Sequence, residues 1–179
     1  MKISTRKLVL NALMIALVFL ITYLPFLHIP SPIVQGYFNI GDSIIMITAI
    51  LLGRKSGFIA GAIGSALADL VYGAFIFVPI TFIVKGLEGY IVGLIANKKS
   101  DKAPSNNRRI ISLVVGALVM ASGYFIFEFT IIRFYDKTLA ITAIVAELPG
   151  NLIQGAVSAI VAYAFVAVID RSKFIKNFK

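Results

Sequence analysis

The segment from Pro79 to Asn97, PITFIVKGLEGYIVGLIAN, is long enough to cross a membrane and yet contains two charged residues, Lys85 and Glu88. A charge near the centre of a bilayer costs roughly 2.5 to 3.5 kcal/mol even on lenient insertion scales, so such residues usually face a bundle interior or a cavity and have a partner. Their spacing of three places both on one helical face, and Thr81 extends that face by one turn. We interpret this polar stripe as one wall of a pocket.

The composition of the whole chain is that of an integral membrane protein. Of its 179 residues, 59% are hydrophobic and 14% are charged, with a mean hydropathy of +0.95, whereas soluble domains average about 45 to 50% apolar and about 25% charged residues. One span needs about 20 apolar residues, so the chain holds about six spans in a single domain, residues 1–179, without a soluble catalytic domain. We therefore predict an all-α polytopic membrane protein with six transmembrane helices.

The net charge of +9 comes from short basic clusters between apolar runs, a pattern typical of membrane topology and not of nucleic-acid binding. With the amino terminus in the cytoplasm, 14 of the 17 Lys and Arg residues fall on the cytoplasmic side, and only Arg133 and Lys137 fall in outer loops. The positive-inside rule then predicts that both termini are cytoplasmic. The chain has no cysteine, which excludes a disulfide framework, a thiol nucleophile and a thiolate metal site.

Six apolar segments define the predicted spans. The first begins after a Ser4 or Thr5 cap and stops at Pro25, and we interpret it as a retained span because no small-residue cleavage site follows it. In the sixth, Pro149 removes one backbone hydrogen bond, and a helix that starts near Glu147 is an alternative. The predicted spans cover residues 6–24, 40–53, 56–74, 79–97, 110–132 and 139–169.

Small residues four apart mark places where helices can approach closely in lipid. Gly57 and Gly61 predict such a contact for the third span. Ala12 and Ala16 form the same kind of motif in the first span, where packing inside the bundle is the simpler explanation of the pair on its own.

Residues 25–41, PFLHIPSPIVQGYFNIG, predict a long connection without helix because they contain three prolines and two glycines. Loops of this length are usually functional or disordered, and the apolar character of this one favours a segment that folds over the membrane surface or dips into the protein. His28 is the only histidine, and we assign it no catalytic role. Asp42 follows the loop, and we interpret it as a helix cap or a first-turn anion that interacts favourably with the helix dipole.

The sixth span has the clearest polar pattern in the chain. Glu147, Asn151, Gln154 and Ser158 recur at i, i+4, i+7 and i+11 and form a stripe along one helical face. In the predicted topology the start of this stripe lies in the outer half of the span.

The charged residues of several spans coincide in depth. Each lies within roughly 15 Å of the outer end of its span, at about 1.5 Å per residue. Pairing of Lys85 with Glu88 or Glu147 would explain any one of them as a contact between helices, but one lysine among four acids leaves carboxylates unbalanced. This excess favours an aqueous cavity that opens to the outside and holds a ligand. The residues predicted to bind the ligand are Lys85, Glu88, Glu128, Glu147, Asn151, Asp69 and Tyr124.

The chain resembles the S-components, which are the substrate-binding membrane subunits of energy-coupling factor (ECF) vitamin transporters. The resemblance rests on the six spans, the cytoplasmic termini, the Ala12 and Ala16 pair, the long loop after the first span, and the sequence ELPGNLIQ from Glu147 to Gln154. It implies a binder that captures a vitamin from outside and docks its first span, through Ala12 and Ala16, on a transmembrane coupling subunit served by two cytoplasmic ATPases. It also implies that the first loop is a lid, with the candidate residues His28, Pro30, Gln35 and Asn39.

By the same resemblance the protein is a multi-pass subunit of the prokaryotic cytoplasmic membrane, and toppling of the whole subunit carries the ligand inward. The sequence has no Gly-x-x-x-x-Gly-Lys-[Ser/Thr] phosphate loop, so ATP hydrolysis is expected from partner chains, and neither a cofactor nor a metal is expected. An acid-rich pocket with one lysine disfavours a polyanionic ligand and suits a small polar heterocycle. The overall appearance is closest to the hydroxymethylpyrimidine/pyridoxine-type S-components, with thiamine, pantothenate or another vitamin as alternatives.

Two other classes of protein are open at this point. A proton-coupled secondary transporter of a small polar solute would use Glu88 or Glu147 as a proton carrier, although the chain lacks the obvious inverted repeat that such folds often show. An intramembrane enzyme would need a nucleophile with a base or a set of metal ligands, and one loop histidine without any cysteine provides neither. The sequence therefore favours a binding subunit over an enzyme.

Overall fold

The computed structural model describes residues 4–31, 37–97, 104–135 and 137–171, and the side chains at positions 28 and 131–146 lie outside this description. Within it, the chain forms six α-helices, and their positions agree with the six predicted segments. The all-α fold class is confirmed, and α6 continues through Pro149 instead of starting near Glu147. The helices are α1 (Thr5–Tyr23), α2 (Gly41–Leu52), α3 (Arg54–Tyr72), α4 (Val78–Ala96), α5 (Asn106–Tyr135) and α6 (Lys137–Arg171).

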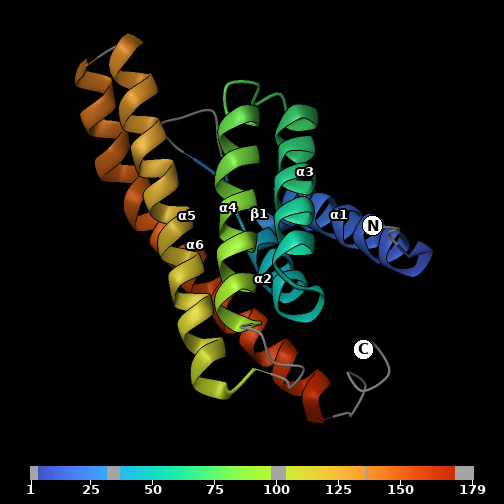
Figure 1. The fold of residues 1–179 in the computed structure, drawn as a ribbon. Helices are drawn as coiled ribbons and strands as arrows, with labels where there is room; N and C mark the ends of the chain where they lie inside the picture. The colour runs from blue at the N-terminus through green and yellow to red at the C-terminus, as the bar shows by residue number, and fades with distance from the viewer. Residues whose placement is uncertain (1–3, 32–36, 98–103, 136, 172–179) are drawn as a thin grey trace.

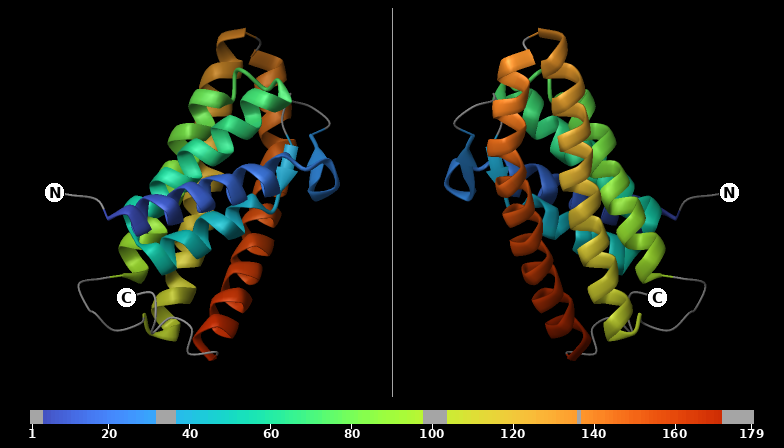
Figure 2. Two further views of the ribbon diagram at one scale, coloured as in Figure 1. Left: turned by 90° about the vertical axis from the view of Figure 1, so that its right-hand side faces the viewer. Right: turned by 90° about the vertical axis from the view of Figure 1, so that its left-hand side faces the viewer.

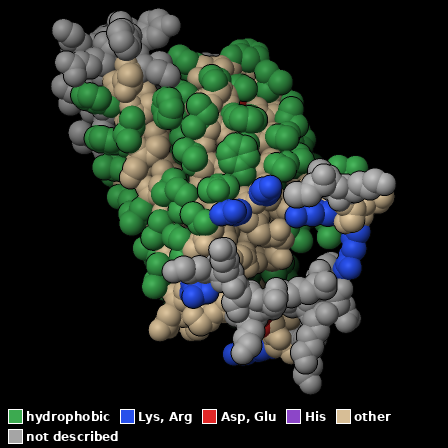
Figure 3. All heavy atoms as spheres, in the orientation of Figure 1, with side chains coloured by type: hydrophobic (Ala, Val, Ile, Leu, Met, Phe, Trp, Pro, Cys, Tyr) green, Lys and Arg blue, Asp and Glu red, His purple; other side chains and the backbone are tan. Residues whose placement is uncertain are grey.

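Among the described residues, four helices are long and apolar enough to cross a membrane, namely α1, α4, α5 over Asn106–Thr130 and α6 over Glu147–Arg171. The α2 helix is apolar but has 12 residues, and about 18 Å of helix is shorter than the roughly 30 Å hydrocarbon core. The chain is a polytopic membrane protein with four long apolar helices, where six spans were predicted. Hydrophobic side chains cover the face shown in Figure 3, and Lys and Arg side chains gather toward its lower part.

The α5 and α6 helices run side by side, next to the pair formed by α3 and α4, and α1 lies across the bundle at a large angle to α4 (Figures 1 and 2). One apolar core cluster joins α2, α4, α5 and α6 through Met46, Val92, Leu113 and Val166. This cluster lies toward the end of the bundle where α4 finishes and α5 begins. The opposite part of the bundle is left for polar side chains.

Small residues make the contact between α3 and α4. A Cβ atom on Gly57 would lie 2.6 Å from the carbonyl oxygen of Gly89, and one on Gly61 would collide with the carbonyl oxygen of Lys85. Two backbones can approach this closely only where no side chain separates them. The predicted close contact at Gly57 and Gly61 is confirmed. It holds α4, which carries Lys85, directly against α3, which carries Asp69.

The connection between α1 and α2 contains a short 3-10 helix, η1 (Pro25–Leu27), and a hairpin of two antiparallel strands, β1 (His28–Pro30) and β2 (Tyr37–Asn39). The prolines and glycines here correctly predicted a connection without α-helix, but the hairpin was not predicted. The strand β2 lies beside α6 (Figure 2). The hairpin therefore sits over the polar part of the bundle.

Candidate functional site

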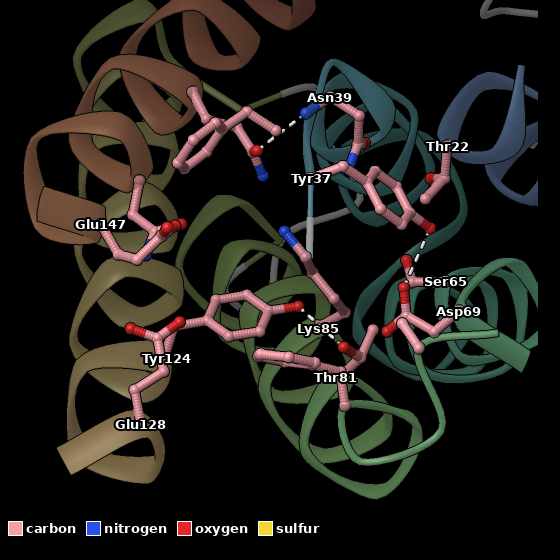
Figure 4. A pocket seen from close by; sticks show the side chains of 15 residues that line it. Thr22, Tyr37, Asn39, Ser65, Asp69, Thr81, Lys85, Tyr124, Glu128 and Glu147 are labelled. Atoms are coloured by element: carbon pink, nitrogen blue, oxygen red, sulfur yellow. Dashed lines mark hydrogen bonds between the residues drawn. The ribbon is translucent and has the colours of Figure 1, made fainter. Parts of the chain in front are cut away.

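A polar pocket lies where α3, α4, α5 and α6 meet β2 (Figure 4). Its lining surrounds ≈ 500 Å³ of empty space when the open mouth is included, but the centre of a water molecule fits in only ≈ 40 Å³ of it. The lining must therefore move apart before a molecule of vitamin size can enter. The described lining residues are Thr22, Tyr37, Phe38, Asn39, Ser65, Asp69, Ala74, Phe77, Thr81, Lys85, Tyr124, Glu128, Glu147, Asn151 and Gln154.

The structure brings six of the seven predicted ligand-binding residues to this one pocket. They come from four helices that are far apart in the sequence, so the coincidence in depth inferred from the topology corresponds to a meeting of side chains in space. The six are Asp69 of α3, Lys85 of α4, Tyr124 and Glu128 of α5, and Glu147 and Asn151 of α6.

Glu88, the seventh predicted residue, does not line the pocket. Its side chain is fully buried, and its carboxylate lies 3.8 Å from the Lys85 ammonium. Both carboxylate oxygens are without a hydrogen-bond partner among the residues that the structure describes. Glu88 thus contacts Lys85, a lining residue, without lining the pocket itself.

Lys85 makes its closest ion pair with Asp42, and the two side chains are 4% and 1% exposed. The interpretation of Asp42 as a helix cap is wrong. Asp42 lies in the first turn of α2, as predicted, but the cap position is Ile40 and has no side-chain hydrogen bond. The Asp42 carboxylate points instead at a cation on α4, a partner that local sequence cannot reveal. The Lys85 ammonium also lies 5.3 Å from the centre of the Tyr124 ring, within the range of a cation–π contact.

Gln154 connects this ion pair to the hairpin. Its side-chain amide nitrogen donates to Asp42 Oδ2 at 2.7 Å, and its oxygen accepts a hydrogen bond from the backbone N–H of Asn39 at 2.9 Å. Gln154 was recognised as part of the polar stripe on α6 but was not predicted as a site residue. Its place on the same helical face as Glu147 is the signal that could have identified it.

The predicted lid residues fall in different places. Asn39 is buried and lines the pocket, and Pro30 is exposed on β1. Gln35 and the side chain of His28 lie outside the described residues, although the backbone of His28 pairs with Asn39 in the hairpin.

Tyr37 and Ser31, which were not predicted, tie the hairpin segment to the pocket. The Tyr37 hydroxyl donates to Asp69 Oδ1 at 2.9 Å, and its ring lies 4.5 Å from that of Tyr72. Burial, reinforced by the neighbouring Asp69 carboxylate, raises the pKa of the Tyr37 phenol above its ordinary value. The Ser31 hydroxyl donates to the Glu147 carboxylate.

Hydroxyl groups complete the polar lining. The Thr81 and Tyr124 hydroxyls share a hydrogen bond of 3.0 Å. The Thr22 and Ser65 hydroxyls are buried and have no hydrogen-bond partner in the described part of the chain, so they can bond to a ligand. No group of three His, Asp or Glu residues suited to a metal ion occurs among the described residues.

The family model described as "ECF-type riboflavin transporter, S component" matches residues 2–171. The chain belongs to this family. This family consists of S components of ECF-type transporters, which are transport subunits of the cell membrane and not enzymes. Membership in the family therefore favours a transport subunit over the secondary transporter and the intramembrane enzyme.

The chain also resembles a curated protein of Pyrococcus woesei, described as an uncharacterized protein in the gap 3'region. The two are 43% identical over 98 residues, which make up 54% of this chain and 62% of the relative. The match thus spans less than two thirds of the relative's length.

The predicted likeness to hydroxymethylpyrimidine/pyridoxine-type S-components is wrong, because the matching family is the riboflavin type. Carboxylates, an amide and one lysine can pair with many small polar heterocycles. The residue types in the sequence therefore did not discriminate between one vitamin and another.

Proposed function

We propose that this S-component binds riboflavin at the outer face of the cell membrane and delivers it through a coupling subunit that is served by ATPases. The proposal is carried by the polar pocket, which offers both hydrogen-bond donors and acceptors in a chain of the riboflavin-type family. Riboflavin has a flat ring system with carbonyl acceptors and an N–H donor at one edge, and a ribityl chain rich in hydroxyl groups.

The lining has a counterpart for each part of such a ligand. The carboxylates of Asp69, Glu128 and Glu147 accept hydrogen bonds from hydroxyl and ring N–H groups, and Lys85 and Asn151 can donate to ring carbonyls. The aromatic side chains of the lining offer flat apolar surfaces for the ring system. They are Tyr37, Phe38, Phe77 and Tyr124.

The distribution of charge supports a pocket that faces outward. Arg54 and Lys55 are exposed at the start of α3, and Asp69 lies near the end of the same helix. Basic residues collect on the cytoplasmic side of membrane proteins. With the start of α3 inside, the pocket opens outward and both termini are cytoplasmic.

Binding of riboflavin is tested by titrating the purified protein with riboflavin and following the fluorescence of the flavin. We expect tight binding of one riboflavin, with pyridoxine and hydroxymethylpyrimidine much weaker. Riboflavin phosphate should bind about tenfold more weakly or worse, because its phosphate adds negative charge beside the carboxylates of the pocket. Binding of pyridoxine in preference to riboflavin would refute the proposal.

The exposed face of α1 is the proposed docking surface for the coupling subunit. Ala12 and Ala16 are exposed on this face, and the large side chains Leu13 and Leu20 beside them are 53% and 45% exposed. Two small residues four apart within an apolar surface allow close approach of a partner helix in lipid. Ala12→Leu and Ala16→Leu should therefore spare riboflavin binding and weaken co-purification with the coupling subunit. Ala156→Leu, at an exposed alanine of α6, is the matched control, and an equal loss with all three variants would contradict the assignment.

A further inference from the structure

One side chain, Gln154, joins the hairpin to the buried ion pair. Gln154 is 7% exposed, and its amide is used at both ends. The oxygen accepts from the backbone N–H of Asn39 in β2, and the nitrogen donates to Asp42 in α2. The other oxygen of Asp42 binds the Lys85 ammonium. An unbroken chain of polar contacts therefore leads from β2 through α6 and α2 to Lys85 on α4.

The direction of each hydrogen bond in this chain is fixed by chemistry. A backbone N–H can only donate, a lysine ammonium can only donate, and a carboxylate can only accept. Between Asn39 and Asp42, the linking group must therefore accept on one side and donate on the other, as the amide of Gln154 does. Because these groups are buried, a wrongly oriented neighbour would leave a polar group without a partner, and that is costly.

We propose that Gln154 is a positioning residue that couples closure of β2 over the pocket to the placement of the Lys85 ammonium. When β2 is closed, the Asn39 N–H fixes the orientation of the Gln154 amide, and Gln154 in turn holds the Asp42 carboxylate toward Lys85. When β2 leaves, this orientation is lost. For its ligand, the inference rests on the proposed riboflavin function, and it deepens that function by assigning the control of ligand release.

The test exchanges the two linking groups. In Asp42→Asn, the new amide can still accept from Lys85 with its oxygen, but its nitrogen then faces the nitrogen of Gln154. The Gln154 amide must therefore turn over, so that its oxygen faces the new amide and its nitrogen faces Asn39. The Asn39 N–H then loses its acceptor, although residue 42 itself makes no bond to Asn39. In Asp42→Asn combined with Gln154→Glu, the new carboxylate accepts from both neighbours. The number of buried charges is that of the original protein, and the chain of hydrogen bonds is restored.

The first readout needs no ligand. Hydrogen exchange of the peptide that contains β2, measured by mass spectrometry, should be about tenfold faster for the Asn39 amide in Asp42→Asn and should return toward the original rate in the double variant. Gln154→Met, which removes both hydrogen bonds without adding a charge, should also exchange faster at Asn39. Ser158→Ala is the matched control, because Ser158 is a buried residue of the same stripe that does not line the pocket.

The second readout is the rate of riboflavin dissociation, which should rise about tenfold in Asp42→Asn and Gln154→Met and fall again in the double variant. If Asp42→Asn leaves the exchange of the Asn39 amide unchanged, or if the double variant exchanges as fast as the single ones, the coupling is refuted. If the exchange pattern is as expected but the original protein does not bind riboflavin, the coupling stands and the proposed substrate is wrong.

Discussion

The two sides of the pocket differ in how their charges are arranged. On the paired side, Lys85, Asp42 and Gln154 bind one another. On the acidic side, the carboxyl groups of Glu128 of α5 and Glu147 of α6 line the same pocket, and Ser31 donates to Glu147. A buried ion pair is neutralised within the protein, whereas two neighbouring carboxylates keep most of their capacity to accept hydrogen bonds. We therefore propose that the paired side fixes the position of the Lys85 ammonium in the pocket and that the acidic side supplies acceptors for the ligand.

The largest effect is expected from Lys85→Met, which breaks the paired side. It leaves the Asp42 carboxylate buried without its cation, and loss of one partner from a buried pair typically costs about 3 to 5 kcal/mol of stability. Thermal unfolding in detergent should show this loss, and riboflavin binding should disappear. In Lys85→Met combined with Asp42→Asn, part of the stability should return because the buried Asp42 charge is removed, although Glu88 still lacks its cation, whereas binding should stay lost. A single variant as stable as the original protein would contradict the buried pair.

The acidic side should respond in the opposite way to Glu147→Gln and Glu128→Gln. Both variants remove one of two like charges without changing the shape of the side chain, so stability should be kept or should rise slightly. Riboflavin affinity should fall about tenfold, because a hydrogen bond to a charged acceptor is replaced by a weaker one. Asp170→Asn is the control, since Asp170 lies at the far end of α6 and pairs with Arg109. Unchanged affinity in both glutamine variants would remove the acidic side from the site.

The residues of the acidic side could be predicted from the sequence. Of the paired side, only Lys85 was predicted as a site residue. Glu128, Glu147 and Asn151 could be identified because a polar residue in an apolar span costs free energy wherever in the span it lies. Asp42 was not predicted as a site residue because its favourable interaction with the helix dipole already explains an acid in the first turn of a helix. The signal that could have found it was its depth, since the start of α2 lies at the outer side in the predicted topology, level with Lys85.

The hairpin of β1 and β2 could not be predicted from local sequence patterns, for a different reason. Strands of three residues are too short to show an alternating pattern, and their pairing depends on contacts with α6 and α3. Gln154 and Tyr37 acquire their roles through these long-range contacts. Sequence periodicity places a residue on a helical face, but it does not say which distant backbone amide or carboxylate that face will meet.

The smallest effect is expected at Tyr37, which joins β2 to α3 through its hydrogen bond to Asp69. Tyr37 belongs to neither the paired side nor the acidic side of the pocket. Tyr37→Phe removes the hydrogen bond to Asp69 and should speed riboflavin dissociation roughly fivefold, for a loss of about 1 kcal/mol. Burial, reinforced by Asp69 and Tyr72, raises the pKa of Tyr37, whereas an exposed tyrosine titrates near pH 10.

The raised pKa of Tyr37 determines how the proposed closure of β2 should respond to pH. The contribution of Tyr37 to closure is fully present below about pH 10 and is lost as the pH rises above it, because the open state then ionises first. Dissociation rates measured from pH 8 to 11 should therefore accelerate more steeply in the original protein than in Tyr37→Phe. Any ionisation of riboflavin itself affects both proteins equally, so the difference between the two curves reports on Tyr37. Parallel curves would show that this hydroxyl does not hold the lid, and β2 would then depend on Gln154 alone among the contacts compared.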